Sequence, residues 1–130
     1  MSKITIYIGN ESDIAEAVRQ SRKMATTIGF VGVSSHYIAT AASELAANVW
    51  VHAGGGVISV LRLSENSGIE IMTVDNGPGI ADIDLAQQEG FSTAKSLGCG
   101  LSGVKRLMDE LHIDSRPGAE TVVRARKWLS

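Results

Sequence analysis

The beginning of the chain alternates polar and apolar residues and then changes to a helical pattern. In KITIYI, residues 3–8, every second side chain is isoleucine, which is the period of a half-buried strand. Apolar residues in segment 14–28 recur on one side of a helix, with Asn10 or Ser12 available as its N-cap and Gly29 suited to its C-terminal end. The pattern therefore predicts a strand followed directly by an amphipathic helix.

A second helix and a hairpin follow. Ser34 and Ser35 can cap a helix that runs to about Ala53, where three consecutive glycines stop it. Segments 57–63 and 69–74 have the composition of strands, and the polar turn that joins them favours a hairpin. We therefore expect these two strands to pair antiparallel.

The last part of the chain begins with a long irregular stretch, residues 75–100. Apolar spacing then predicts a helix over 101–111, and two short strands near 112–115 and 120–127 flank an Arg-Pro-Gly turn. The order β-α-α-β-β-loop-α-β-β indicates an α/β (α+β) two-layer sandwich with a mixed, mainly antiparallel sheet and helices on one face. A loop of that length in a small domain is usually functional or disordered.

Composition places the chain among globular domains and excludes several partners. The 130 residues, 44% of them hydrophobic, carry a net charge of −2, which fits a single domain over 1–130 and gives no basic footprint for nucleic acid. No apolar run approaches the length of a membrane span. The single cysteine, Cys99, indicates a reducing compartment. We expect a cytoplasmic protein.

The glycines Gly98, Gly100 and Gly103 have the spacing G-x-G-x-x-G, which is a weak signal alone. A dinucleotide fold would need a strand immediately before them, but the polar run 87–93 precedes them. A conventional protein-kinase loop would need V-A-I-K and H-R-D downstream, and neither follows. Two interpretations remain: a phosphate-binding loop that opens a helix, or an ordinary flexible loop.

A carboxylate and two glycines form a second motif, VDNGPGI, at positions 74–80. Asp75 could accept a hydrogen bond from the exocyclic amine of an adenine, directly or through water. Gly77 and Gly79 would let the backbone come close to a flat ring. The alternative is a simple turn, since Asn-Gly and Pro-Gly are strong turn formers.

Three polar residues on one helical stripe form the third motif, within SELAANVWVHA. Glu44, Asn48 and His52 are spaced i, i+4, i+8, so they share a face. Asn48 could give its oxygen to a Mg²⁺ ion, which prefers oxygen ligands and usually keeps substrate phosphates and waters in its shell. The alternative is a solvated polar face, which we favour for His52 alone.

E-x-x-x-N, D-x-G-x-G and G-x-G-x-x-G in this order resemble the GHKL ATPase superfamily of gyrase, Hsp90, histidine kinases and MutL. The segments ELAANVWVHA, VDNGPGI and GFSTAKSLGCGLSGVKRLMDEL resemble more narrowly the anti-sigma-factor serine kinases, and among them the stressosome switch kinases. This resemblance covers essentially the whole chain. It implies a Bergerat-type ATP-binding fold with ATP and Mg²⁺ as cofactors.

The resemblance also implies a role for individual residues. Glu44 would be the general base, Asn48 would coordinate Mg²⁺, and Asp75 would bind the adenine amine. Residues 81–97 would form an ATP lid. The other implied site positions are Gly77, Gly79 and Ile80 at the adenine, Gly98, Gly100, Leu101 and Gly103 at the phosphates, and Thr121 on a late strand near the adenine. Cys99 and Ala47 depart from the family pattern, and Ala47 removes a phosphate contact that Thr or Arg commonly supplies there.

The implied function is that of a serine/threonine protein kinase and switch protein. It would phosphorylate a serine of a STAS-domain antagonist and, once released, activate a PP2C-type partner phosphatase; a homodimer is compatible with the family. The alternative is an ATP-binding anti-sigma factor that sequesters a sigma factor. A detached histidine-kinase catalytic domain fits less well, because the loop between D-x-G-x-G and G-x-G-x-x-G is short and no phospho-acceptor helix precedes the domain.

Overall fold

The computed structural model describes residues 2–64, 67–75, 77, 100–115 and 120–129. In these residues the order of helices and strands is the expected one. The elements are β1 (Lys3–Ile8), α1 (Ser12–Ile28), α2 (Gly32–Ala53), β2 (Gly56–Arg62), β3 (Gly68–Asp75), α4 (Leu101–Leu107), β4 (Glu110–Asp114) and β5 (Thr121–Trp128).

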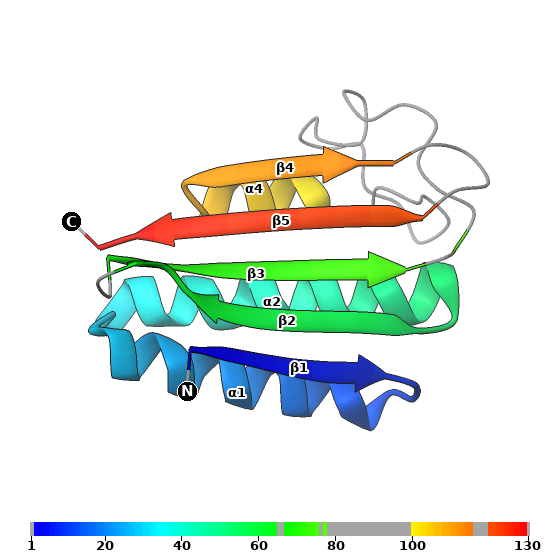
Figure 1. Ribbon diagram of the computed structural model, residues 1–130, viewed down its shortest axis with the longest axis horizontal. Coiled ribbons are helices and arrows are strands. Elements are labelled where there is room, and N and C mark those ends of the chain that lie inside the picture. Colours follow the sequence, from blue (N-terminus) through cyan, green and yellow to red (C-terminus); the bar gives the residue numbers. More distant parts are fainter. Residues whose placement is uncertain (1, 65–66, 76, 78–99, 116–119, 130) are drawn as a thin grey trace.

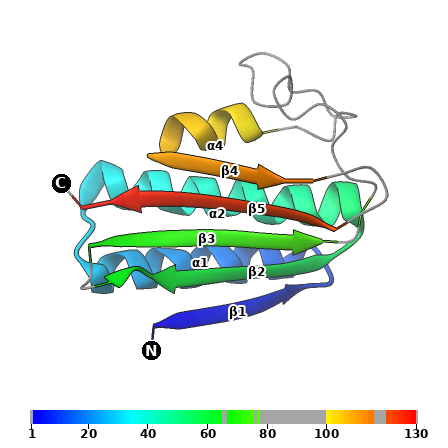
Figure 2. The ribbon, with the colours of Figure 1, turned by 45° about the horizontal axis from the view of Figure 1, so that its top comes forward.

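Five strands form one sheet in the order β1-β2-β3-β5-β4. Every neighbouring pair is antiparallel, and the described helices α1, α2 and α4 lie on one face of the sheet (Figures 1 and 2). The prediction of a two-layer sandwich with a mainly antiparallel sheet is confirmed. The same alternation that predicted β1 explains its place, since its isoleucines face the helices and its polar side chains face away.

Helix α1 ends at the predicted glycine, but its N-cap is Glu11, not the predicted Asn10 or Ser12, and Glu11 makes no side-chain cap hydrogen bond. The Asn10 side chain accepts a hydrogen bond of 3.2 Å from the Asp13 N–H, which satisfies one of the free donors of the first turn. Gly29 ends the helix with φ +126°, and its N–H donates to the Ala25 carbonyl. Glycine adopts this backbone angle without the steric cost that a Cβ would bring.

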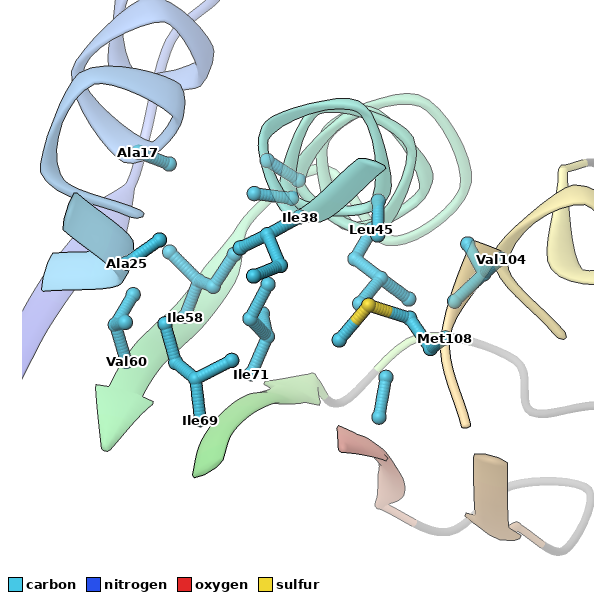
Figure 3. Close-up of a cluster of buried hydrophobic side chains, with 14 of the residues drawn as sticks. Ala17, Ala25, Ile38, Leu45, Ile58, Val60, Ile69, Ile71, Val104 and Met108 are labelled. Atoms are coloured by element: carbon cyan, nitrogen blue, oxygen red, sulfur yellow. The ribbon is translucent and has the colours of Figure 1, made fainter. Parts of the chain in front are cut away.

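The hydrophobic core lies between the helices and the sheet (Figure 3). Ile38 and Leu45 of α2 are almost fully buried, as are Ile58 and Ile71 of the central strands. Each such side chain contributes about 1.5–3 kcal/mol when it is removed from water. Alanines on α2 allow close packing: Ala41, Ala42 and Ala46 have no exposed surface. This core fixes α2 against the strands that carry the candidate site.

The start of α2 differs from the prediction. The helix begins at Gly32, two residues before the predicted serine caps, and its N-cap residue, Val31, makes no side-chain cap hydrogen bond. Phe30 explains the difference: it is buried, with 3% exposure, and its N–H still bonds to the Ala25 carbonyl at the end of α1. Burial of this ring fixes a short connection, so α2 starts without Ser34 or Ser35 as a cap.

The predicted helix over 101–111 is too long. α4 ends at Leu107, whose carbonyl accepts a 2.9 Å hydrogen bond from the Lys127 ammonium. Leu111 belongs to β4 and stands opposite Ala125 in β5. The spacing of Leu111 fits both a helix and a strand, and pairing with β5 provides backbone hydrogen bonds that a longer helix would lose.

Candidate functional site

The polar stripe of α2 is held on a rigid, buried helix. Glu44, Asn48 and His52 are all half-buried, while Leu45 and Val49 between them are in the core, each with 1% exposure. Because the apolar residues fix the rotation of α2, the three polar side chains stay on its remaining face. That stripe leads to the end of α2, where β3 also ends (Figure 1).

Gly100 approaches the carboxylate of Glu44 closely. It is the N-cap of α4, with φ +84°, and its carbonyl accepts the first hydrogen bond of the helix from the Val104 N–H at 3.0 Å. A Cβ on Gly100 would collide with Oε2 of Glu44 and lie 3.3 Å from its carboxyl carbon. The backbone angle favours glycine, and any side chain at this position would displace the Glu44 carboxylate. The contact brings the middle glycine of G-x-G-x-x-G beside the predicted general base.

Asn48 carries a polar atom in need of a partner. Its Nδ2 is buried and has no hydrogen-bond partner among the residues that the structure describes. Leaving such a group unsatisfied costs about 1–3 kcal/mol. A bound ligand that reaches this amide would recover that free energy, which fits Asn48 as a ligand-contacting residue.

The donor set near Asn48 suits a Mg²⁺ ion held mainly by its substrate. Glu44 and Asn48 offer oxygen atoms, which Mg²⁺ prefers. Within the described residues, no group of three His, Cys, Asp or Glu side chains could hold a metal ion. An ion at this site would therefore depend on Asn48 together with phosphate oxygens and water, which is the usual way in which Mg²⁺ binds with nucleotides.

Asp75 ends β3 and organises the turn that follows. Its Oδ1 accepts a 2.9 Å hydrogen bond from the Gly77 N–H. A Cβ on Gly77 would lie only 2.8 Å from Cβ of Ala53, the last residue of α2. The turn interpretation of this motif thus explains Gly77, while the second carboxylate oxygen of Asp75 receives no hydrogen bond from the described part of the chain. That oxygen could accept one from a ligand.

Thr121 lies directly opposite Asp75 in the β3–β5 ladder. Its hydroxyl is 2.8 Å from the Ser115 hydroxyl, and both side chains are buried. Thr121 is therefore brought next to the predicted adenine-binding carboxylate. Ser115 was not among the predicted site residues, because a single serine carries no spacing signal.

His52 requires a correction. We expected a solvated side chain, but burial lowers the pKa of His52 below its ordinary value of 6.5, and the negative charge of Asp75 partly offsets this effect. The two residues thus interact electrostatically across the end of α2 and the end of β3. The i+8 spacing from Glu44, which places His52 on the same face of α2, was the sequence signal that could have indicated a half-buried His52.

Two predicted phosphate-site residues occupy different environments. The side chain of Leu101 is in the core with 2% exposure, so only its backbone could contact a ligand. A Cβ on Gly103 would meet nothing closer than Nη2 of Arg106 at 3.9 Å, so packing does not require glycine there. Gly79, Ile80, Gly98 and the predicted lid, residues 81–97, lie outside the described residues, and their roles stay predictions.

The layered fold and the position of the motifs along the second half of α2, with Gly100 at Glu44 and Gly77 at Ala53, are typical of an ATPase-type nucleotide-binding domain. The chain belongs to the family of histidine kinase-like ATPase domains, and the model of this family matches residues 10–127. The predicted resemblance to this superfamily is confirmed.

Sequence identity to individual proteins indicates which members of this family the chain is similar to. The chain is 43% identical over 126 residues to the serine/threonine-protein kinase RsbT of Bacillus subtilis (strain 168), and the match covers 95% of each chain. It is 35% identical over 98 residues to an anti-sigma F factor of Caldanaerobacter subterraneus, covering 71% of this chain and 68% of the relative. An anti-sigma F factor of Heyndrickxia coagulans is 31% identical over 99 residues, with 70% and 67% covered.

The described helices show no membrane-spanning character. Among them, none combines the length and the apolar composition that crossing a bilayer requires.

Proposed function

We propose that this chain is an ATP-dependent serine/threonine protein kinase that also acts as a switch protein. The observation that carries the proposal is the contact between Glu44 and Gly100, which places a carboxylate beside the glycine loop. Phosphoryl transfer depends mainly on positioning and charge neutralisation. A carboxylate next to a phosphate-binding loop is well placed to accept the proton of an attacking serine. The 43% identity to a serine/threonine-protein kinase supports this activity.

The proposed roles of the site residues follow their positions along α2. Asp75 binds the adenine amine, with Thr121 beside it, and Glu44 acts near the γ-phosphate. Asn48 lies between these ends of the site on the same stripe and would ligate Mg²⁺, which supplies positive charge against the phosphates when bound. Gly79, Ile80, Gly98, the backbone of Leu101 and Gly103 complete the proposed nucleotide contacts, under a lid formed by residues 81–97.

The proposed substrate is a serine of a STAS-domain antagonist in a stressosome-like complex. After phosphorylation, the added charge of about −1.5 to −2 would face Glu44 and the nucleotide phosphates, so the partner would leave. The released kinase would then activate a PP2C-type phosphatase in the cytoplasm. A STAS partner with Ser→Asp should accordingly bind more weakly than one with Ser→Ala.

An anti-sigma factor remains the second candidate, since two relatives of 35% and 31% identity carry that name. In that case the domain would sequester a sigma factor, and kinase activity would be secondary. Co-purification from the native host separates the two, because STAS proteins would favour the first function and a sigma factor the second.

The decisive experiment is transfer of labelled γ-phosphate from ATP to STAS proteins encoded beside this chain. We expect labelling of one serine by the wild-type chain and almost none by Glu44→Gln. Equal labelling by both proteins would remove Glu44 from the chemistry. No labelling of any STAS protein, with a sigma factor retained instead, would favour the sequestering function.

A further inference from the structure

A cavity lies between α1 and the β1–β2 edge of the sheet. It has a volume of about 480 Å³ and is lined by Ile4, Gln20, Lys23, Met24, Thr27 and Arg62, within the usual size range of ligand pockets. β2 separates it from the nucleotide site: Gly56 lies beside Asp75, whereas Arg62 ends the strand, roughly 20 Å away at the rise of a strand. The cavity is therefore a separate site.

The lining of this cavity is cationic and holds an unpaired donor. Nε of Arg62 is buried and has no hydrogen-bond partner among the described residues. Lys23 adds a second positive charge. The carboxylate of Glu16, which lies on the same helix as Lys23, is already engaged by Gln20 at 2.8 Å and by Arg19, whose side chain is exposed. A buried guanidinium donor without a partner is costly, so the site favours an anionic group.

The edge of the sheet beside this cavity is open. β1 is the first strand in the sheet order, and no described segment lies beyond it (Figure 2). The Ser2 carbonyl accepts a 2.7 Å hydrogen bond from the Arg62 N–H. Because hydrogen-bonded and non-hydrogen-bonded residue pairs alternate along an antiparallel ladder, the N–H and C=O groups of Lys3, Thr5 and Tyr7 point away from β2. These outward N–H and C=O groups can pair with another strand.

We propose that an extended segment of a partner protein adds to this edge of β1 and places a carboxylate side chain in the cavity. Residues directly opposite each other in a ladder point to the same face. A residue opposite Ile4 would therefore point to the helix side, where Ile4 itself lines the cavity with Lys23 and Arg62. Main-chain pairing would supply affinity, and the ion pair would supply specificity.

Charge complementarity selects this occupant over a second copy of the chain. The segment that a second copy would add, KITIYI, has no carboxylate and brings another cation, Lys3. Like charges in one half-buried cavity repel. The proposal concerns a surface away from the nucleotide site, and it stands whether or not the kinase function is correct.

The test uses peptides as probes. Eight-residue peptides of alternating threonine and valine, with one central Glu or its Gln counterpart on either face, are titrated into the full chain by fluorescence anisotropy. We expect one Glu peptide to bind about tenfold or more tightly than its Gln counterpart, as for a charge-assisted hydrogen bond. It should also protect the amides of Lys3, Thr5 and Tyr7 from hydrogen exchange.

Variants locate the binding site. Arg62→Gln should reduce the affinity for the Glu peptide to that for the Gln peptide, and Lys23→Gln should act in the same direction. Arg19→Gln, which removes an exposed cation from α1, is the matched control and should change nothing. Unchanged thermal unfolding midpoints in these variants would show that they are folded.

A last variant tests the strand edge itself. Thr5→Pro removes an outward N–H that β2 does not use, a substitution that edge strands tolerate, and it should abolish peptide binding. Equal affinity for Glu and Gln peptides would overturn the anionic cavity. Binding unaffected by Thr5→Pro, no peptide binding, or edge protection that rises only with protein concentration would overturn strand addition by a partner.

Discussion

The carboxylate of Glu44 occupies the space in which a side chain on Gly100 would begin. One residue comes from the middle of α2 and the other from the N-cap of α4, so packing of these two helices creates the contact. The glycine motif had two interpretations from the sequence, a phosphate-binding loop or an ordinary loop. Its position against the predicted general base favours the first.

Gly100→Ala should therefore affect both stability and chemistry. The alanine must adopt φ +84° and displace the Glu44 carboxylate, so we expect a loss of about 2 kcal/mol or more in unfolding free energy and strongly reduced phosphotransfer. Gly54→Ala is the matched control, because Gly54 has φ +74° but nothing within 4 Å of its added Cβ.

Gly54→Ala should cost about 1 kcal/mol and leave phosphotransfer unchanged. Urea unfolding and labelled-ATP assays measure the two effects. If both variants lost the same stability and both kept full activity, the contact with Glu44 would have no functional role.

Glu44→Gln should separate chemistry from binding. The amide keeps the shape of the side chain but cannot act as a base, so phosphotransfer should fall by about 10²–10⁴-fold. Affinity for Mg·ATP should stay near that of the wild type, as measured by calorimetric titration. A large loss of affinity with unchanged turnover of the bound nucleotide would instead make Glu44 a binding residue.

Sequence patterns predicted those parts of the molecule in which local spacing and burial agree. The alternation of KITIYI and the polar stripe of α2 both occur where expected. Leu111 was assigned to a helix because its spacing fits both a helix and a strand. Its pairing with Ala125 in the sheet, which the sequence pattern does not reveal, makes it part of β4. The charged cavity at Arg62 could not be predicted, since its lining comes from three elements and depends on packing.

Asp75→Asn should weaken nucleotide binding strongly while the fold is kept. The amide oxygen can still accept the hydrogen bond that Gly77 donates at 2.9 Å, so the turn should survive. Its NH₂ group would then take the place of the second carboxylate oxygen and face the proposed adenine amine, donor against donor. Unchanged ATP affinity in calorimetry, with an unchanged thermal midpoint, would remove Asp75 from the adenine site.

The same substitution should lower the pKa of His52 further. Burial lowers this pKa from 6.5, and the charge of Asp75 opposes that shift, so removal of the charge leaves burial unopposed. NMR titration of the His52 ring in wild type and Asp75→Asn measures the difference directly. A pKa that stayed the same or rose would show that the two side chains do not interact.

The lowered pKa of His52 also sets a direction for the pH dependence of stability. The unfolded chain binds a proton at this imidazole near pH 6.5, whereas the folded chain binds it only at lower pH. The contribution of His52 to the unfolding free energy should therefore be complete above pH 6.5. It should be lost as the pH falls from 6.5 toward the lower pKa of the folded state. His52→Gln should flatten urea midpoints across that window, and His36→Gln, which removes an exposed imidazole, serves as the control. An unchanged slope in His52→Gln would mean that other groups cause the acid sensitivity and that His52 is not held uncharged by burial beside Asp75.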